Sequence, residues 1–113
     1  MLAAACGGGY VPRTGDLLFQ RTAAEGMGDA IAAATRRDTA VTFTHVGIVE
    51  AASDGVFVVE AIDTSVRRTP LADFLARSAQ RGGRPLAAVG RLRAADAATI
   101  DRAMRRARAR LGL

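Results

Sequence analysis

The chain has 113 residues, half of them apolar, which is enough for one modest hydrophobic core and predicts a single domain. No run of about 18 apolar residues occurs, which argues against a transmembrane helix. The single cysteine excludes an internal disulfide, and the single histidine has no cluster of carboxylates near it in the sequence, so we expect no metal and no cofactor.

The net charge of +5 is distributed unevenly along the chain. Residues 1–66 contain four arginines and eight acidic residues, whereas residues 67–113 contain twelve arginines and three acidic residues. The second part is therefore the one expected to face an anionic partner.

The first nine residues resemble the end of a bacterial lipoprotein signal, with small residues before Cys6 and glycines after it. Only four residues separate Met1 from Cys6, far fewer than the ~7–15 apolar residues of an export signal. We interpret residues 1–13 either as a flexible terminus or as the remnant of a lipoprotein signal. The expected localisation is the cell envelope or periplasm if Cys6 belongs to such a signal, and the cytoplasm otherwise.

Short apolar runs and turn residues predict the elements that follow. Residues 17–20 are predicted as a strand, and residues 23–35 as a short helix because apolar residues recur there at helical spacing. A central hairpin is predicted from strands at residues 44–51 and 56–62, with the turn at residues 53–55.

Three further elements are predicted after the hairpin. Residues 65–68 form a brief third strand, and residues 70–78 form a helix with Thr69 as its N-cap and Pro70 at its first position. Residues 80–85 contain two glycines and are predicted as an exposed loop.

The last two predicted elements are a strand and a regular helix. Residues 87–93 alternate like a half-buried strand, with Val89 or Leu92 directed inward. Between residues 96 and 111, apolar residues fall on one stripe, arginines occupy the remaining surface, and Gly112 is placed to cap the helix. The stripe consists of Ile100, Ala103, Met104, Ala107 and Leu111. The elements together predict an α+β fold, in which helices pack on a small antiparallel sheet.

The only histidine and one acidic residue stand out in the hairpin. His45 begins the first strand, and Glu60 interrupts the apolar second strand. A carboxylate beside an imidazole orients it as a general base. An unpaired buried carboxylate is costly, so Glu60 either has a partner or faces solvent on an edge strand.

The pairing register of the hairpin decides whether these two side chains meet. A two-residue turn at Asp54-Gly55 would place Glu60 opposite Val49, too far along the strand from His45. A four-residue loop, Ala52 to Gly55, would place Glu60 opposite Gly47 and diagonal to His45, and a six-residue loop would place it directly opposite His45. The catalytic interpretation therefore predicts a loop wider than two residues.

The order of several motifs resembles that of a known family. The motifs are Gly15-Asp16-Leu17-Leu18-Phe19, His45-Val46-Gly47-Ile48-Val49, Val58-Val59-Glu60-Ala61, Thr69-Pro70-Leu71 and Val89-Gly90-Arg91-Leu92. Over roughly residues 14–111, the chain is similar to the circularly permuted branch of the NlpC-type, papain-like cysteine hydrolases, in particular to the YiiX and YebB-like proteins.

This resemblance implies a half or near-complete permuted papain-like domain over residues 14–113, which hydrolyses an amide or ester bond by a cysteine thiolate. It implies that His45 is the catalytic base and that Glu60 orients it. In this branch the nucleophile follows the histidine in a Tyr-Cys-Ser-type motif, and no cysteine follows His45 here. We expect that the chain is truncated before the nucleophile, that the nucleophile arrives on a separate polypeptide, or that the domain binds ligands without catalysis.

The resemblance also implies a substrate, either a cell-wall peptide or a lipid-linked acyl group. The arginine-rich terminal helix supports a competing function, a non-catalytic basic module for an anionic ligand, lipid or nucleic acid. The scarcity of aromatic residues argues against nucleic acid as a partner, whereas association with a membrane surface remains an expectation. A half-domain that exposes apolar surface is expected to associate with itself or with a missing C-terminal segment.

Overall fold

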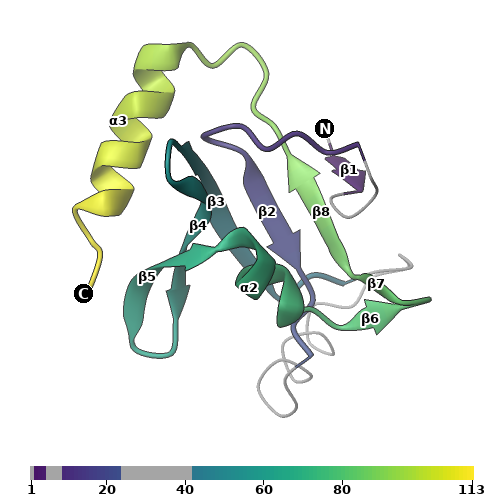
Figure 1. Ribbon diagram of the computed structural model, residues 1–113. Helices are drawn as coiled ribbons and strands as arrows, with labels where there is room; N and C mark the ends of the chain where they lie inside the picture. The colour runs from purple at the N-terminus through teal and green to yellow at the C-terminus, as the bar shows by residue number, and fades with distance from the viewer. Residues whose placement is uncertain (1, 5–8, 24–41) are drawn as a thin grey trace.

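The computed structural model describes residues 2–4, 9–23 and 42–113. Its centre is an antiparallel six-stranded sheet with the strand order β1-β8-β2-β3-β4-β5 (Figure 1). The strands are β1 (Leu2–Ala4), β2 (Leu17–Gln20), β3 (His45–Ala52), β4 (Gly55–Ile62), β5 (Ser65–Pro70) and β8 (Ala87–Gly90). The remaining described elements are helices α2 (Leu71–Ala76) and α3 (Ala97–Arg108) and a separate hairpin of β6 (Gln80–Arg81) and β7 (Arg84–Pro85). The predicted α+β class is confirmed.

The central hairpin of β3 and β4 pairs in a register that brings Glu60 beside Gly47. Valine and isoleucine make up seven of the sixteen residues of β3 and β4, which favours strands. Ala52 pairs with Gly55, so the turn consists of Ser53 and Asp54. Ile48 pairs with Val59, and the next position along this register sets Glu60 beside Gly47. This is the register predicted for the four-residue loop, but the predicted loop length is wrong. Because Ala52 and Gly55 also pair, a two-residue turn shifted by one position from Asp54-Gly55 gives the same register.

One face of the sheet carries the hydrophobic core. Side chains of β2, β3, β4 and β8 alternate so that Leu18, Val49, Val58 and Val89 share this face, and Phe74 of α2 packs against them. Each is buried, and full burial of such a side chain stabilises the fold by about 1.5–3 kcal/mol. The core therefore holds α2 over the middle of the sheet.

Helix α3 packs on the other face. Its N-cap is Asp96, whose carboxylate accepts a hydrogen bond from the N–H of Thr99 at 2.7 Å, and its Met104 is buried. Gly15 has φ +94°, and a Cβ at that position would lie 2.8 Å from Cδ1 of Ile100. The glycine thus permits both the left-handed turn before β2 and the close approach of the helix.

A buried acid ties α3 to the sheet. Glu50 of β3 accepts a hydrogen bond from Nε of Arg68 at 2.5 Å and another from Nε of Arg108 at the end of α3. The guanidinium of Arg68 also lies 3.5 Å over the ring of Phe57. Like Glu60, Glu50 is a carboxylate in an otherwise apolar strand, but nothing in the sequence predicted its partners.

Two predictions between β5 and β8 are wrong. Thr69 does not cap α2, because it lies in β5 paired with Val58; Pro70 occupies the N-cap position without a side-chain hydrogen bond. Residues 80–85 are not a loop but the hairpin β6–β7, because Gly82 and Gly83 both adopt positive φ and close a tight turn. Of the two inward candidates in the following strand, Val89 is buried and Leu92 is exposed.

The ends of the chain also differ from expectation. Helix α3 stops at Arg108 with Ala109 as its C-cap, because Leu111 bridges to Val66 of β5 and Gly112 donates its N–H to the Val66 carbonyl. Strand β1 pairs with β8, and the sequence did not predict it because residues 2–4 carry no alternation. The helix predicted at residues 23–35 lies outside the described residues apart from position 23. Within the described part of the chain, neither helix has the length and hydropathy of a membrane span.

Candidate active site

His45 and Glu60 lie together on the α2 face of the sheet. Nε2 of His45 is 2.7 Å from Oε1 of Glu60. Gly47 stands between them along the register, and a Cβ there would lie 2.3 Å from Cγ1 of Val58 and 3.4 Å from Cβ of Glu60. A side chain at position 47 would therefore displace Val58, which lies two positions before Glu60 on β4.

The carboxylate of Glu60 is ionised at neutral pH and fully buried. Burial acts to raise its pKa, but hydrogen bonds from His45, Arg77 and Thr69 and the charge of Arg77 outweigh it and lower the pKa to about 2. An ionised carboxylate only accepts hydrogen bonds, so Nε2 of His45 carries the proton. In the neutral imidazole, Nδ1 is then left as the basic nitrogen.

Arg77 completes the set of charged groups around Glu60. It follows α2 and donates a hydrogen bond from Nη2 to Oε2, the carboxylate oxygen that His45 does not use. Its guanidinium also lies 5.4 Å from the centroid of the Phe74 ring. Sequence reasoning missed Arg77, since no spacing rule connects the residue after a short helix with a strand residue seventeen positions earlier.

Phe74 and Gln20 pack around the imidazole. The Phe74 ring stacks on His45 with a centroid distance of 5.8 Å and an angle of 28° between the ring planes. Gln20 of β2 pairs directly with His45 and is fully buried, and its Nε2 donates to the Phe74 carbonyl at 2.9 Å and to Oγ of Ser78 at 2.7 Å. The side chain of His45 retains 18% exposure, so the imidazole is fixed in orientation yet accessible.

A third buried acid, Asp16, immediately precedes β2, at the end of the strand away from His45. Asp16 accepts from Nε of Arg91 at 2.7 Å, from Nη2 of Arg91 at 2.8 Å and from the Tyr10 hydroxyl at 2.8 Å. Burial acts to raise the pKa of Asp16, but the hydrogen bonds from Arg91, Arg13 and Tyr10 lower it below its ordinary value. This bidentate pair joins β2 to the end of β8, so these motif residues position strands rather than contact His45.

The described residues contain no group of three or more His, Cys, Asp or Glu side chains arranged to hold a metal ion. Cys6, the only cysteine of the sequence, lies outside the described residues. The site geometry therefore rests on His45, Glu60 and Arg77.

Residues 11–113 match the model of a family described as permuted papain-like amidase enzyme, YaeF/YiiX, C92 family. The chain belongs to this family. The permuted papain-like relationship predicted from the motifs is confirmed, and the domain is a papain-like amidase or hydrolase domain of the YaeF/YiiX family. Neither the curated proteins nor the solved structures gave a match to the chain.

In this YaeF/YiiX-family domain, the pair of His45 and Glu60 has the geometry of a general base and its orienting carboxylate. An imidazole whose Nε2–H is held by a buried carboxylate presents Nδ1 to an incoming proton donor. A thiol brought to Nδ1 is deprotonated to the thiolate, the nucleophilic form of cysteine.

Proposed function

We propose that this chain supplies the catalytic base and its orienting residue to a cysteine hydrolase of the NlpC type. His45 is the base, and Glu60 holds its tautomer and its ring orientation. The observation that carries this proposal is the 2.7 Å contact between Nε2 of His45 and Oε1 of a fully buried Glu60. The buried acids Glu50 and Asp16 are paired with arginines, whereas Glu60 also contacts an imidazole that is 18% exposed.

The proposed reaction is hydrolysis of an amide or ester through an acyl-enzyme. Nδ1 of His45 takes the proton of a cysteine thiol, and the thiolate adds to the substrate carbonyl. The imidazolium then gives this proton to the leaving amine or alcohol, so the acyl group remains on sulfur. Water, deprotonated by the same nitrogen, releases the acid and restores the thiol. Glu60 stabilises the imidazolium in both halves of the reaction.

The nucleophile is the unassigned part of this proposal. The sequence contains one cysteine, Cys6, only nine positions before Gly15, which is too close to form the nucleophile helix of the unpermuted fold. We infer that the thiol is supplied from outside these 113 residues, by a further segment or by a partner polypeptide, and that the chain alone does not turn over substrate. Cell-wall peptides and lipid-linked acyl groups are the proposed substrate classes.

The tautomer of His45 tests the base–orienter pair without a nucleophile. Long-range proton–nitrogen NMR on the chain at a pH where the imidazole is neutral is expected to show the proton on Nε2. Glu60→Ala is expected to remove this preference, whereas Asp54→Ala, an exposed acid in the turn of the same hairpin, leaves it unchanged. A proton on Nδ1 in the unmodified chain would refute the proposed orientation.

Reconstitution tests the hydrolase function itself. The chain is joined to, or mixed with, a polypeptide that carries a Tyr-Cys-Ser-type segment, and is assayed with an activated ester. We expect turnover that requires both the added cysteine and His45. Turnover by the unmodified 113-residue chain that Cys6→Ala abolishes would contradict the inference that the thiol is external.

A second candidate function rests on the charge of α3. Arg102, Arg105, Arg106 and Arg110 are exposed, and within the described part of the chain only Arg108 of this helix binds a carboxylate. Such a surface suits a non-catalytic basic module for an anionic ligand, lipid or nucleic acid. Affinity for these ligands that falls steeply with salt, together with no effect of His45→Ala, would favour this function over the hydrolase.

A further inference from the structure

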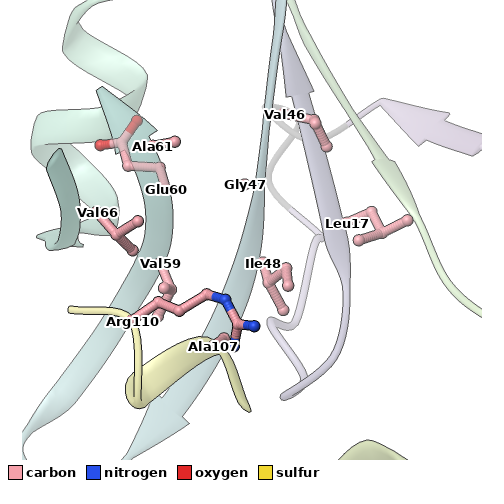
Figure 2. A pocket seen from close by; sticks show the side chains of 10 residues that line it. All are labelled: Leu17, Val46, Gly47, Ile48, Val59, Glu60, Ala61, Val66, Ala107 and Arg110. Atoms are coloured by element: carbon pink, nitrogen blue, oxygen red, sulfur yellow. The ribbon is translucent and has the colours of Figure 1, made fainter. Parts of the chain in front are cut away.

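A cavity of about 350 Å³ lies between α3 and the sheet. Apolar side chains line it almost completely, and its size is within the range of small-molecule sites, about 300–1,000 Å³. The lining side chains that matter here are Leu17, Val46, Ile48, Val59, Val66 and Ala107 (Figure 2).

This cavity is on the opposite face of the sheet from the imidazole. Ile48 and Val59 are a cross-strand pair, and each is one position removed from the residues that face α2. Glu60 and Gly47 also border the cavity, but the Glu60 carboxylate bonds to His45 and Arg77 on the α2 side. A ligand here therefore shares strands with the candidate active site without occupying it.

One cation borders this apolar space. Arg110 follows the C-cap of α3, and Figure 2 shows its side chain extending from the helix toward Ile48. Its Nη1 donates to the Arg106 carbonyl at 3.1 Å, and among the described residues no carboxylate lies within ion-pair distance of its guanidinium. The other guanidinium donors are therefore available to an anionic group at the rim of the cavity.

Both parts of the cavity point to one ligand chemistry. An apolar lining of aliphatic side chains suits a saturated hydrocarbon chain, and a single guanidinium at the edge suits one carboxylate. We propose that the cavity binds a free, single-chain fatty acid, with its hydrocarbon chain between α3 and β3–β4 and its carboxylate at Arg110. This site is independent of the proposed hydrolase chemistry, because it requires neither a thiol nor His45.

Dodecanoate is the probe, tested by isothermal titration on the full chain below its micelle concentration. Ala107→Phe fills the cavity and is expected to weaken binding by at least about tenfold. Its matched control is Ala103→Phe, one turn earlier on α3 at an exposed position that does not line the cavity, which is expected to leave the affinity unchanged.

The carboxylate contact is tested separately from the hydrocarbon contact. Arg110→Gln is expected to weaken dodecanoate by about tenfold while leaving the affinity for uncharged dodecanol unchanged. Arg106→Gln removes the same charge one turn earlier, outside the cavity lining, and serves as the control. His45→Ala is expected to bind dodecanoate like the unmodified chain.

Three outcomes would overturn the proposal. The first is an absence of dodecanoate binding by the unmodified chain. The second is binding that Ala107→Phe does not weaken, or that Arg106→Gln and Arg110→Gln weaken equally, since either result assigns the ligand to the general positive charge of α3. The third is a dimer whose formation closes the cavity and competes with dodecanoate, which would make a second copy of the chain the occupant.

Discussion

Arg77 and His45 share the carboxylate of Glu60, one at each oxygen. The side chain of Arg77 is one-third exposed, whereas that of Glu60 is fully buried. The ion pair with Arg77 stabilises the buried negative charge at Oε2, the oxygen that His45 does not contact. Removing either partner leaves a buried oxygen without its donor, which costs more than the pair itself contributes.

The first prediction concerns this shared carboxylate. Arg77→Met keeps most of the side-chain stem over Phe74 but leaves Oε2 of Glu60 without its charged donor, and we expect a loss of about 1–3 kcal/mol in the free energy of unfolding. Arg84→Met, in the exposed hairpin, is the control and is expected to change it by under about 0.5 kcal/mol. In the double variant Arg77→Met/Glu60→Gln the loss should be smaller than the sum of the single losses. Urea unfolding measures all four values, and strict additivity would contradict the coupling.

The second prediction is the pH dependence of stability. The pKa of Glu60 is lowered from 4.5 to about 2 in the folded chain, so the unfolded chain binds a proton more readily. The stabilisation is complete above about pH 4.5, is lost as the pH falls toward 2, and amounts to about 3 kcal/mol. Glu60→Gln should therefore show a shallower fall in unfolding free energy between pH 5 and 2, by chemical denaturation, than the unmodified chain. Equal slopes would show that Glu60 does not titrate in this window.

The third prediction concerns Gly47 of β3, where the side chain of Val58 on β4 approaches the backbone closely. A Cβ on Gly47 would lie 2.3 Å from Cγ1 of Val58, closer than packed atoms tolerate, so Gly47→Ala should reduce the unfolding free energy by about 1–3 kcal/mol. It should also shift the His45 side-chain NMR signals, because Val58 must move away from position 47 and Glu60 lies two residues further along the same strand. Gly9→Ala has nothing within 4 Å of the added carbon and is expected to be neutral. An unchanged His45 signal in Gly47→Ala would argue against the proposed role of the glycine.

The fourth prediction concerns the attachment of α3. Arg108→Met removes one of two donors from buried Glu50, and we expect a loss of about 1–2 kcal/mol and faster amide hydrogen exchange along α3. Arg105→Met, exposed on the same helix, should change neither quantity. If both variants behave alike, the Arg108–Glu50 contact does not hold the helix.

The central part of the fold was predictable because local patterns determine it. Alternation and β-branched residues located β2 and the hairpin within one residue. The catalytic interpretation left two registers open, and the observed register is one of them, although the loop is shorter than predicted. The contact between His45 and Glu60 followed from that register. Whether these side chains catalyse a reaction stays a prediction.

The missed features depend on contacts between distant parts of the chain. Arg77 reaches Glu60 only because Phe74 anchors α2 on the core, and β1 forms because β8 offers it an open edge. The proline at position 70 makes Thr69 look like a helix N-cap in the sequence. In the structure, Thr69 instead pairs with Val58 in the sheet. None of these relationships has a fixed spacing in sequence.

The last residues of the chain run along the outer strand of the sheet. Leu111 bridges to Val66 in parallel, and Val66 exchanges backbone hydrogen bonds with Gly112 and Leu113. Unpaired strand edges are templates for edge-to-edge assembly between molecules, and these contacts occupy the edge of β5 near its first residue. Pairing with residues 111–113 therefore leaves less of the β5 edge open to another molecule, independently of any chemistry at His45.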